Sequence, residues 1–270
     1  VQTDAAATRA SVAAVSHEDA EAWDRLGAQL GAWAPHPVGF LQSDLPSWQS
    51  LRALRHAHKA LGSEGLYELI RLALTSTRSF GHASFSSRAM TALLASWGMH
   101  LDFAPDIPGG ALFSYLETLG GQVFGMAIGH GGADTLTRAL VSIIEENGGE
   151  VRCGSAVTEV TVEKSKARGV ILASGEHVQA GRAVISNINP SLMPDLLPDL
   201  ASTKSVARAK GYEPGLATMM IHLALDAPAP WINSQAAGFN YVHIGPYVDD
   251  MAMTYAQAAS GSLPTSPTNC

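Results

Sequence analysis

Cysteine is scarce in this sequence, which has only Cys153 and Cys270 among its 270 residues. Cys153 falls within a predicted strand and Cys270 is the last residue, so the two thiols do not outline a disulfide framework. We expect Cys153 to behave as a small buried apolar residue. This cysteine usage favours a reducing compartment, and we therefore expect a cytoplasmic location.

Clustered positive charge is also missing. The chain has 17 lysine and arginine residues against 24 aspartate and glutamate residues, a formal net charge of −7, and no long run of either sign. Non-specific binding to phosphate backbones needs clustered lysine and arginine. Nucleic acid is therefore excluded as an expected partner.

Long apolar runs are absent as well, because no segment reaches the roughly eighteen uninterrupted apolar residues of a membrane-spanning helix. The longest candidate, 215–225, contains His222 and is followed by DAPAP. Residues 1–15 lack the basic start and the apolar block of a signal peptide. We expect no membrane span, and peripheral membrane association stays open. Because the chain begins at Val1, we expect a processed product or a fragment of a longer protein.

Signatures of metal and nucleophile chemistry do not occur in the sequence. There is no H-E-x-x-H, no Cys-x-x-Cys and no G-x-S-x-G motif. His56 and His58 are two residues apart and would point to different sides of a helix. The serines of SFSS at 84–87 are interpreted as a helix cap. We predict neither a metal site nor a catalytic side chain.

The apolar content of 46% is enough for the core of one large domain or two smaller ones. Amphipathic helices are expected throughout residues 1–119. Ser16 caps the first, with Glu18 and Asp19 in its first turn, and APHP at 34–37 ends it. Further helices are expected near 46–61, 63–74, 86–99 and 111–119. Together they predict a helical layer or cap.

Residues 150–186 change to an alternation of apolar and polar side chains with period two, which is typical of β-strands. Strands are expected at 150–153, 156–163, 167–173 and 177–186, with turns at 164–166 and 174–176. The middle two strands form a hairpin, whose buried faces carry Val160, Val162, Val170 and Leu172. Further elements are expected as strands at 216–225 and 239–244, a helix at 249–259 and a loop-like tail at 260–270. The predicted fold class is mixed α/β (α+β).

The stretch GHGG at 129–132 precedes a helix that 147–149 terminates. It partly matches the G-x-G-x-x-G turn of dinucleotide folds, but Asp134 occupies the third glycine position, where its carboxylate would repel a pyrophosphate. We therefore interpret the segment as a buried helix joined to a strand. Its apolar stripe consists of Leu136, Ala139, Leu140, Ile143 and Ile144. The glycines indicate a close approach of the backbone to a neighbouring element or a ligand.

Residues 129–190 as a whole resemble the middle of the phytoene desaturase-like family of FAD-dependent oxidoreductases. The shared motifs are a Gly-Gly before a helix, GGE-V-R after it, a V-x-x-V hairpin, a G-V-x-L-A-x-G-E turn and V-x-S-N-x-x-P. They occur in the family's order, at 131–132, 148–152, 157–160, 169–176 and 184–190. Residues 108–125 are similar to the family's substrate-domain segment.

The resemblance implies FAD as the cofactor and five cofactor-binding residues, which are Gly131, Gly132, Val157, Ser186 and Asn187. It implies that the Gly-Gly helix and the hairpin build one wall of the cofactor domain, with the backbone at Val157 against the flavin adenine. Ser186 and Asn187 would lie at a strand end near the adenosine side. From the residues alone, Ser186 and Asn187 form a hydrogen-bonded turn that leads into Pro190.

The resemblance also implies a division of the chain into domains. Residues 1–125 form the helical part of a substrate domain, 126–190 form part of an FAD-binding Rossmann-like domain, and 191–270 form substrate-domain strands with a C-terminal helix. The expected substrate domain is a helical layer over a β-sheet. The family's opening G-x-G-x-x-G and closing Gly-Asp flavin segment are absent, so we expect a central portion of the enzyme that binds FAD weakly by itself.

By resemblance, the enzyme dehydrogenates or desaturates a largely apolar, isoprenoid-like substrate and passes the hydride to FAD. The alternative is a non-enzymatic module of the same fold that binds a hydrophobic ligand or partner without flavin. Residues that could line a substrate tunnel, and that core packing also explains, are Trp97, Phe113, Tyr115, Met219 and Met220. The expected partner is an apolar small molecule, and a truncated cofactor domain with an exposed apolar edge predicts self-association into homo-oligomers.

Overall fold

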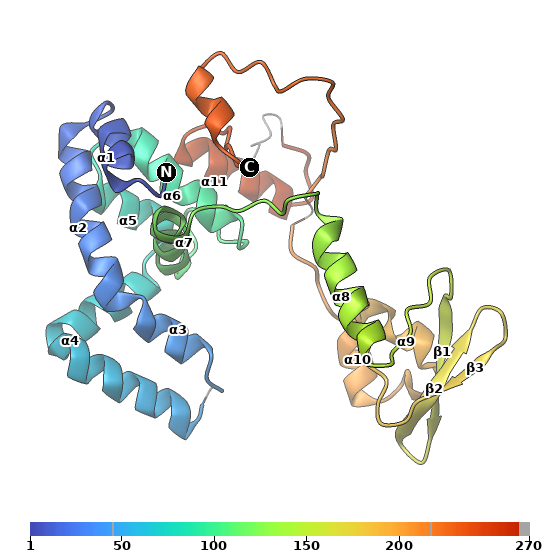
Figure 1. Cartoon of the computed structure of the whole chain (residues 1–270). Helices are drawn as coiled ribbons and strands as arrows, with labels where there is room; N and C mark the ends of the chain where they lie inside the picture. The colour runs from blue at the N-terminus through green and yellow to red at the C-terminus, as the bar shows by residue number, and fades with distance from the viewer. Residues whose placement is uncertain (45, 217, 265–270) are drawn as a thin grey trace. The chain divides into compact units, whose positions relative to one another are not determined.

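The structure of the chain is a computed structural model that describes residues 1–44, 46–216 and 218–264. The chain divides into two compact units, with unit 1 formed by residues 1–127 and 218–270 and unit 2 by residues 128–217. The predicted mixed α/β fold class is confirmed (Figure 1). The predicted assignment of domains to the family's substrate and cofactor parts stays a prediction.

The described part of unit 1 is built from helices. They are α1 (Ala5–Ala13), α2 (His17–Trp33), α3 (Pro35–Leu41), α4 (Trp48–Leu74), α5 (Thr77–Ser84), α6 (Arg88–Met99), α7 (Gly110–Phe124) and α11 (Val248–Ala259), with a 3₁₀ turn at Ser234–Gly238. Unit 2 combines helices with a small sheet. Its elements are α8 (Asp134–Glu146), β1 (Val157–Glu163), β2 (Lys166–Leu172), β3 (His177–Gln179), α9 (Met193–Leu196) and α10 (Lys204–Lys210), with 3₁₀ turns at Pro190–Leu192 and Pro198–Leu200.

Serine residues begin two helices of unit 1 where the sequence predicts them. Ser16 caps α2, because its Oγ accepts a hydrogen bond of 3.2 Å from the amide of Asp19. Ser87, the last serine of SFSS, caps α6 in the same way through the amide of Met90. Both predicted caps are confirmed. The APHP stretch ends α2 as predicted, and the chain then continues directly into α3.

Helix α4 joins two of the predicted helices into one element. A capping box between Ser47 and Ser50 begins it, and Gly62 interrupts it with a φ of 71°. This break falls between the two predicted ranges. The sequence does not predict α1 and α5, because helices of 9 and 8 residues give little periodicity.

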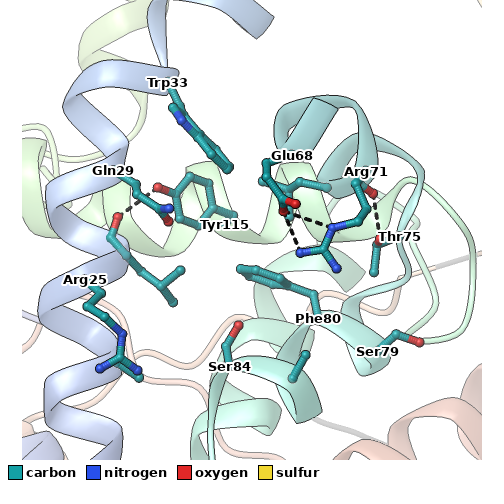
Figure 2. A pocket seen from close by; sticks show the side chains of 14 residues that line it. Arg25, Gln29, Trp33, Glu68, Arg71, Thr75, Ser79, Phe80, Ser84 and Tyr115 are labelled. Carbon is teal, nitrogen blue, oxygen red and sulfur yellow. Dashed lines mark hydrogen bonds and ion pairs between the residues drawn. The ribbon is translucent and has the colours of Figure 1, made fainter. Parts of the chain in front are cut away.

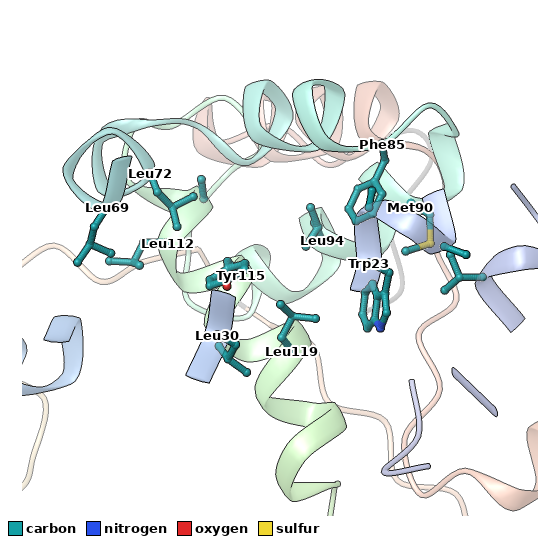
Figure 3. Packing of buried hydrophobic residues seen from close by; sticks show 14 residues of the cluster. Trp23, Leu30, Leu69, Leu72, Phe85, Met90, Leu94, Leu112, Tyr115 and Leu119 are labelled. Carbon is teal, nitrogen blue, oxygen red and sulfur yellow. The ribbon is translucent and has the colours of Figure 1, made fainter. Parts of the chain in front are cut away.

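Helix α7 lies at the centre of the unit 1 core, where it contacts α2, α4, α5 and α6. Its buried residues Tyr115 and Leu119 pack among apolar side chains of the surrounding helices (Figure 3). These partners include Trp23, Leu30, Leu69, Leu72, Phe85, Met90 and Leu94. Removal of this apolar surface from water is the main stabilising contribution to the helical unit.

Polar contacts fix how the helices of unit 1 meet. Asp19 on α2 is fully buried and accepts hydrogen bonds from the amides of Ser86 and Ser87 at the start of α6. Arg78 on α5 forms an ion pair with Asp249 in the first turn of α11. Helix α11 is therefore connected to the first hundred residues by charge as well as by packing.

The sheet of unit 2 has three antiparallel strands in the order β1-β2-β3. Val160 pairs with Val170 in the β1–β2 hairpin, and Lys164 and Ser165 form its tip with φ values of 48° and 60°. The predicted hairpin and its turn are confirmed. Of the four side chains predicted to be buried in the hairpin, only Leu172 is buried, and the others are partly exposed.

Several predicted strands differ from the structure. Residues 150–153 form no strand, and the strand predicted at 177–186 is limited to β3. The described residues of 216–225, which exclude 217, are not a strand, and in 239–244 only Ile244 forms a bridge. A strand forms where a neighbouring strand satisfies its backbone N–H and C=O groups, and an alternating pattern does not supply that neighbour.

Two predictions of burial are wrong. Helix α8 contains no buried residue, and its apolar stripe is exposed to solvent, with Leu136 69% and Leu140 53% exposed. Cys153 is an exposed free thiol. A helical pattern identifies the apolar face of a helix but not whether another element covers that face.

The end of the chain is described up to residue 264. The helix predicted at 249–259 is confirmed as α11, while residues 265–270 of the predicted tail, Cys270 included, lie outside the described residues. Within the described ranges, no helix combines the length and the apolar character needed to cross a bilayer.

Candidate functional site

A pocket of about 730 Å³ opens among four helices of unit 1. Its walls come from α2, α4, α5 and α7, and Figure 2 shows the side chains that line it. Helical spacing puts Arg25 and Gln29 on one face of α2, and Glu68 and Arg71 on one face of α4. A volume of this size lies within the range of about 300–1,000 Å³ that is typical of small-molecule sites.

Three aromatic rings form the apolar wall of this pocket. Tyr115 lies between Trp33 and Phe80, with ring centroids 6.4 Å and 6.0 Å away. Its hydroxyl donates a hydrogen bond of 2.8 Å to the carbonyl oxygen of Leu26, and burial raises the pKa of the Tyr115 phenol. Tyr115 therefore stays neutral at ordinary pH and serves as part of the apolar lining rather than as an acid or a base.

Polar side chains line the pocket from α2 and from α4, on either side of Tyr115 and Phe80 (Figure 2). Arg71 donates from Nε and Nη2 to one oxygen of Glu68, at 3.0 Å and 2.6 Å. Arg25 and Gln29 line the pocket from α2 (Figure 2). The ionisable side chains of the lining are thus two arginines, one glutamate and the neutral Tyr115.

The pocket lining offers binding surfaces rather than a catalytic group. No histidine or cysteine belongs to it in the part of the chain that the structure describes. Glu68, its carboxylate, is held by Arg71. Such a site can orient an apolar molecule and exclude water.

Of the five residues that could line a substrate tunnel, only Tyr115 lines this pocket. Phe113 stacks on Phe103 with centroids 5.0 Å apart. Trp97 packs in a separate ring cluster, and Met219 and Met220 are 84% and 72% exposed in an irregular segment. The sequence misses Trp33 and Phe80 as lining residues, since both fit the pattern of an ordinary apolar helix face.

The predicted glycine pair of the cofactor site lies just before α8. Gly131 and Gly132 have φ values of 90° and 101°, a conformation that favours glycine. A Cβ at Gly131 would lie 3.5 Å from Thr135 Oγ1, an ordinary contact. The glycines therefore serve the turn itself, and the close backbone approach expected from GHGG is not observed at Gly131.

The other predicted cofactor residues are in unit 2 as well. Val157 begins β1, pairs with Leu172 and is 40% exposed. Ser186 and Asn187 lie outside any strand, so their predicted position at a strand end is wrong. The turn before Pro190 is made instead by Asn189, whose side chain accepts hydrogen bonds from the amide and hydroxyl of Ser191.

These observations test how far the predicted residues fit FAD. No hydrogen bond or ion pair among the described residues joins the glycine pair to Val157, Ser186 or Asn187. The first turn of α8 carries Asp134, which is paired with Arg138 at 3.1 Å, and a pyrophosphate placed there would meet a carboxylate. The turn before α8 therefore does not fit a pyrophosphate, while Val157 is accessible on edge strand β1.

A second group of interacting side chains joins α6 to the segment before α11. The Nε2 atoms of His100 and His243 are 2.7 Å apart, and Tyr241 Oη lies 3.2 Å from His100 Nε2. Burial, and then the charge of His100, lower the pKa of His243 to about 4. Among the described residues no group of three or more His, Cys, Asp or Glu side chains could hold a metal ion.

The sequence of the chain is similar to known proteins. The profile of the family "Flavin containing amine oxidoreductase" matches residues 17–262. The chain is 31% identical over 159 residues to the phytoene desaturase (neurosporene-forming) of Cereibacter sphaeroides, a match that covers 58% of this chain and 26% of that protein. It is 28% identical over 117 residues to the 4,4'-diapophytoene desaturase (4,4'-diapolycopene-forming) of Methylomonas sp, covering 43% of this chain and 23% of that protein.

The similarity to these relatives is partial. The matched segments span about a quarter of the length of each curated relative, at 26% and 23%. No solved structure matches the chain significantly.

Proposed function

Since the chain belongs to the flavin containing amine oxidoreductase family, we propose that it takes part in the flavin-dependent dehydrogenation or desaturation of a largely apolar substrate. This membership agrees with the resemblance to phytoene desaturase-like oxidoreductases that residues 129–190 carry. The observation that supports the proposal best is the pocket of about 730 Å³ with its wall of Trp33, Phe80 and Tyr115. It offers apolar contact to a substrate and no side chain poised for acid–base chemistry.

In the proposed reaction the pocket residues bind and orient the substrate and keep water away. Acceptance of a hydride is the chemistry that a bound flavin supplies. Tyr115 donates no proton to the substrate, because its hydroxyl is engaged with the carbonyl of Leu26. The isoprenoid character of the substrate is part of the proposal, supported by the names of the two desaturases that the chain resembles.

We further propose that Gly131, Gly132 and Val157 contact the adenosine half of FAD, with Ser186 and Asn187 near it. The exposed Val157 on an edge strand supports this assignment. Because Asp134 disfavours a pyrophosphate at the turn before α8, the complete site needs a G-x-G-x-x-G element, which this sequence does not contain.

A second candidate function is a non-enzymatic module that binds a hydrophobic ligand or partner without flavin. The carboxylate of Asp134 in the first turn of α8 favours it, since the chain then has no need of a pyrophosphate site. Binding of flavin distinguishes the two functions.

The test is the visible absorption spectrum of the purified chain with increasing FAD, recorded before and after desalting. The proposal predicts a perturbed flavin spectrum in the mixture and its loss on desalting, because the adenosine half alone binds weakly. The variant Val157→Glu should abolish the perturbation, and Thr158→Glu on the same strand is the matched control. An unperturbed flavin spectrum at every FAD concentration would overturn the proposal in favour of the non-enzymatic module.

A further inference from the structure

We propose that the pocket among α2, α4, α5 and α7 selects a ligand whose apolar body ends in a carboxylate, such as an isoprenoid or long-chain acid. The inference rests on the proposed function in one respect, because it takes this pocket as the substrate site. It goes further in the chemistry of the ligand, since an apolar substrate in general needs no anionic end.

The apolar body of the ligand follows from the aromatic wall. Trp33, Phe80 and Tyr115 line the same hollow, and the phenol of Tyr115 is already satisfied by the carbonyl of Leu26 (Figure 2). A ligand that covers these rings gains free energy from the apolar area removed from water. The aromatic wall itself therefore requires no polar group on the ligand.

The anionic end follows from the charged residues of the lining, which are Arg25 on α2 and, beyond Tyr115 and Phe80, Arg71 with Glu68 on α4 (Figure 2). Arg25 and Arg71 line the pocket together with a single carboxylate, Glu68, so the ionisable lining carries an excess of one positive charge. A ligand that is apolar throughout would cover these charges without replacing their water, which costs free energy. A carboxylate would compensate the excess charge and leave the aromatic wall to the rest of the molecule.

The geometry of Arg71 supports the same assignment. Its Nε and Nη2 both donate to one oxygen of Glu68, and Nη1 makes no hydrogen bond with the residues that the structure describes. Arg25 has no ion pair within the described ranges. Guanidinium groups match the fork of a carboxylate and bind it through paired hydrogen bonds.

A cationic end fits the pocket less well. An amine on the ligand would have to compete with Arg71 for Glu68 and would face two guanidinium groups. The pocket therefore discriminates by charge between ligands that share an apolar body.

The test uses three probes with the same polyene body and different ends, which are retinoic acid, retinol and retinylamine. Binding to the full chain is measured by quenching of tryptophan fluorescence, since Trp33 lies in the pocket wall. We expect retinoic acid to bind about tenfold more tightly than retinol, which corresponds to about 1.4 kcal/mol, and retinylamine to bind least. The preference for the acid should weaken as salt is added.

Variants assign the effect to the pocket. Arg71→Gln should remove the preference, so that retinoic acid and retinol bind with similar affinity. Arg25→Gln, on a different helix, provides a second test that does not disturb the Glu68 pair. Arg55→Gln is the matched control, because Arg55 is an exposed residue of α4 outside the pocket.

Equal affinity for the acid and the alcohol, or tighter binding of the amine, would overturn the inference. So would a preference for the acid that survives both pocket variants. The assay contains no FAD, so its failure leaves the flavin titration to decide the proposed function independently.

Discussion

Asp19 shows how one buried side chain connects two helices of the core. It lies on α2, has no exposed surface, and accepts hydrogen bonds from the amides of Ser86 and Ser87. Burial by itself would raise the pKa of Asp19, but the hydrogen bonds from the two serines outweigh it and lower the pKa. The ionised carboxylate therefore stabilises the fold above the unfolded pKa of about 3.9, and this contribution is lost as the pH falls through the folded value.

Replacement of Asp19 by alanine should destabilise the chain by about 2–3 kcal/mol, because the amides of Ser86 and Ser87 at the start of α6 lose a charged acceptor. Urea unfolding followed by circular dichroism measures the change. Asp24→Ala on the same helix is the control, since Asp24 forms an exposed ion pair with Arg9 and should cost less than about 1 kcal/mol. Similar losses for the two variants would contradict the role of Asp19.

The pKa of His243 predicts that the stability of the chain depends on pH. Its pKa is lowered to about 4 in the folded chain, below the unfolded value of about 6.5. The unfolded chain therefore takes up this proton first on acidification, so the stability present above pH 6.5 declines as the pH falls toward 4. The facing ionisable groups are His100 and Tyr241.

His243→Phe keeps a ring against Trp97 and removes the titration. Between pH 6.5 and 4 the unmodified chain should lose on the order of 1 kcal/mol more than this variant, after allowance for solvent screening. Unfolding free energies at the two pH values give the comparison, and His56→Gln serves as an exposed control. A variant with the full pH dependence of the parent chain would rule out His243 as its source.

At the scale of elements, β2 and β3 meet at a glycine. A Cβ at Gly169 would come within 2.2 Å of the carbonyl oxygen of Val178 and 3.1 Å of the Cα of Gln179. Gly169 belongs to the G-V-x-L-A-x-G-E motif, and its presence there is explained by the close approach of two strands.

Gly169→Ala should detach β3 from the sheet, at a cost of about 1–3 kcal/mol from overpacking. Hydrogen exchange of the amides at 177–179 should become faster, because their partners on β2 move away. Gly181→Ala is the matched control, since a Cβ there has no neighbour within 4 Å. Unchanged protection of β3 in the Gly169 variant would show that the strands tolerate the methyl group.

Rules that depend on neighbouring residues in the sequence predict the helices and strands of this chain better than they predict which elements pack against one another. Ser16 and Ser87 are recognised as caps because a cap and the helix it begins are neighbours in sequence. The segment 216–225 is as apolar as a strand, but a strand also needs a neighbour that its own residues do not determine. The same limit applies to α8. The sequence pattern correctly identifies its apolar stripe, but it does not say whether another element covers that stripe.

The candidate site is harder to predict from the sequence than the helices and strands are. Arg25, Glu68, Phe80 and Tyr115 come from four helices and meet only after the core has formed. None of them belongs to a catalytic motif, and the pattern around each is that of an amphipathic helix. The cofactor-binding residues are predicted only from the resemblance of residues 129–190 to a known family, and their roles stay predictions.

The exposed apolar face of α8 predicts that the chain associates with itself. Leu136, Leu140 and Ile143 are each more than half exposed on one side of this helix. Apolar surfaces of this kind associate with one another when no other element covers them. We therefore propose that copies of the chain interact through α8.

Leu140→Glu should shift the chain toward a monomer, because a charge in the centre of the apolar face must be desolvated on association. Light scattering over a range of concentrations measures the shift. Ser142→Glu adds the same charge to α8 outside the apolar stripe and should leave the association unchanged. A parent chain that is monomeric at all concentrations would exclude this surface as an interface.

The discontinuity of unit 1 has a consequence for how the chain is made. Its first stretch ends at residue 127, and α11, which buries Val248 and Met251 against Ala95 of α6, begins at residue 248. A ribosome that adds about 5–20 residues per second needs roughly 6–24 seconds to reach α11 after the first stretch is complete. During that interval the apolar face of α6 that α11 later covers is exposed to solvent. The nascent chain therefore has a transient binding site for chaperones that the finished protein no longer has.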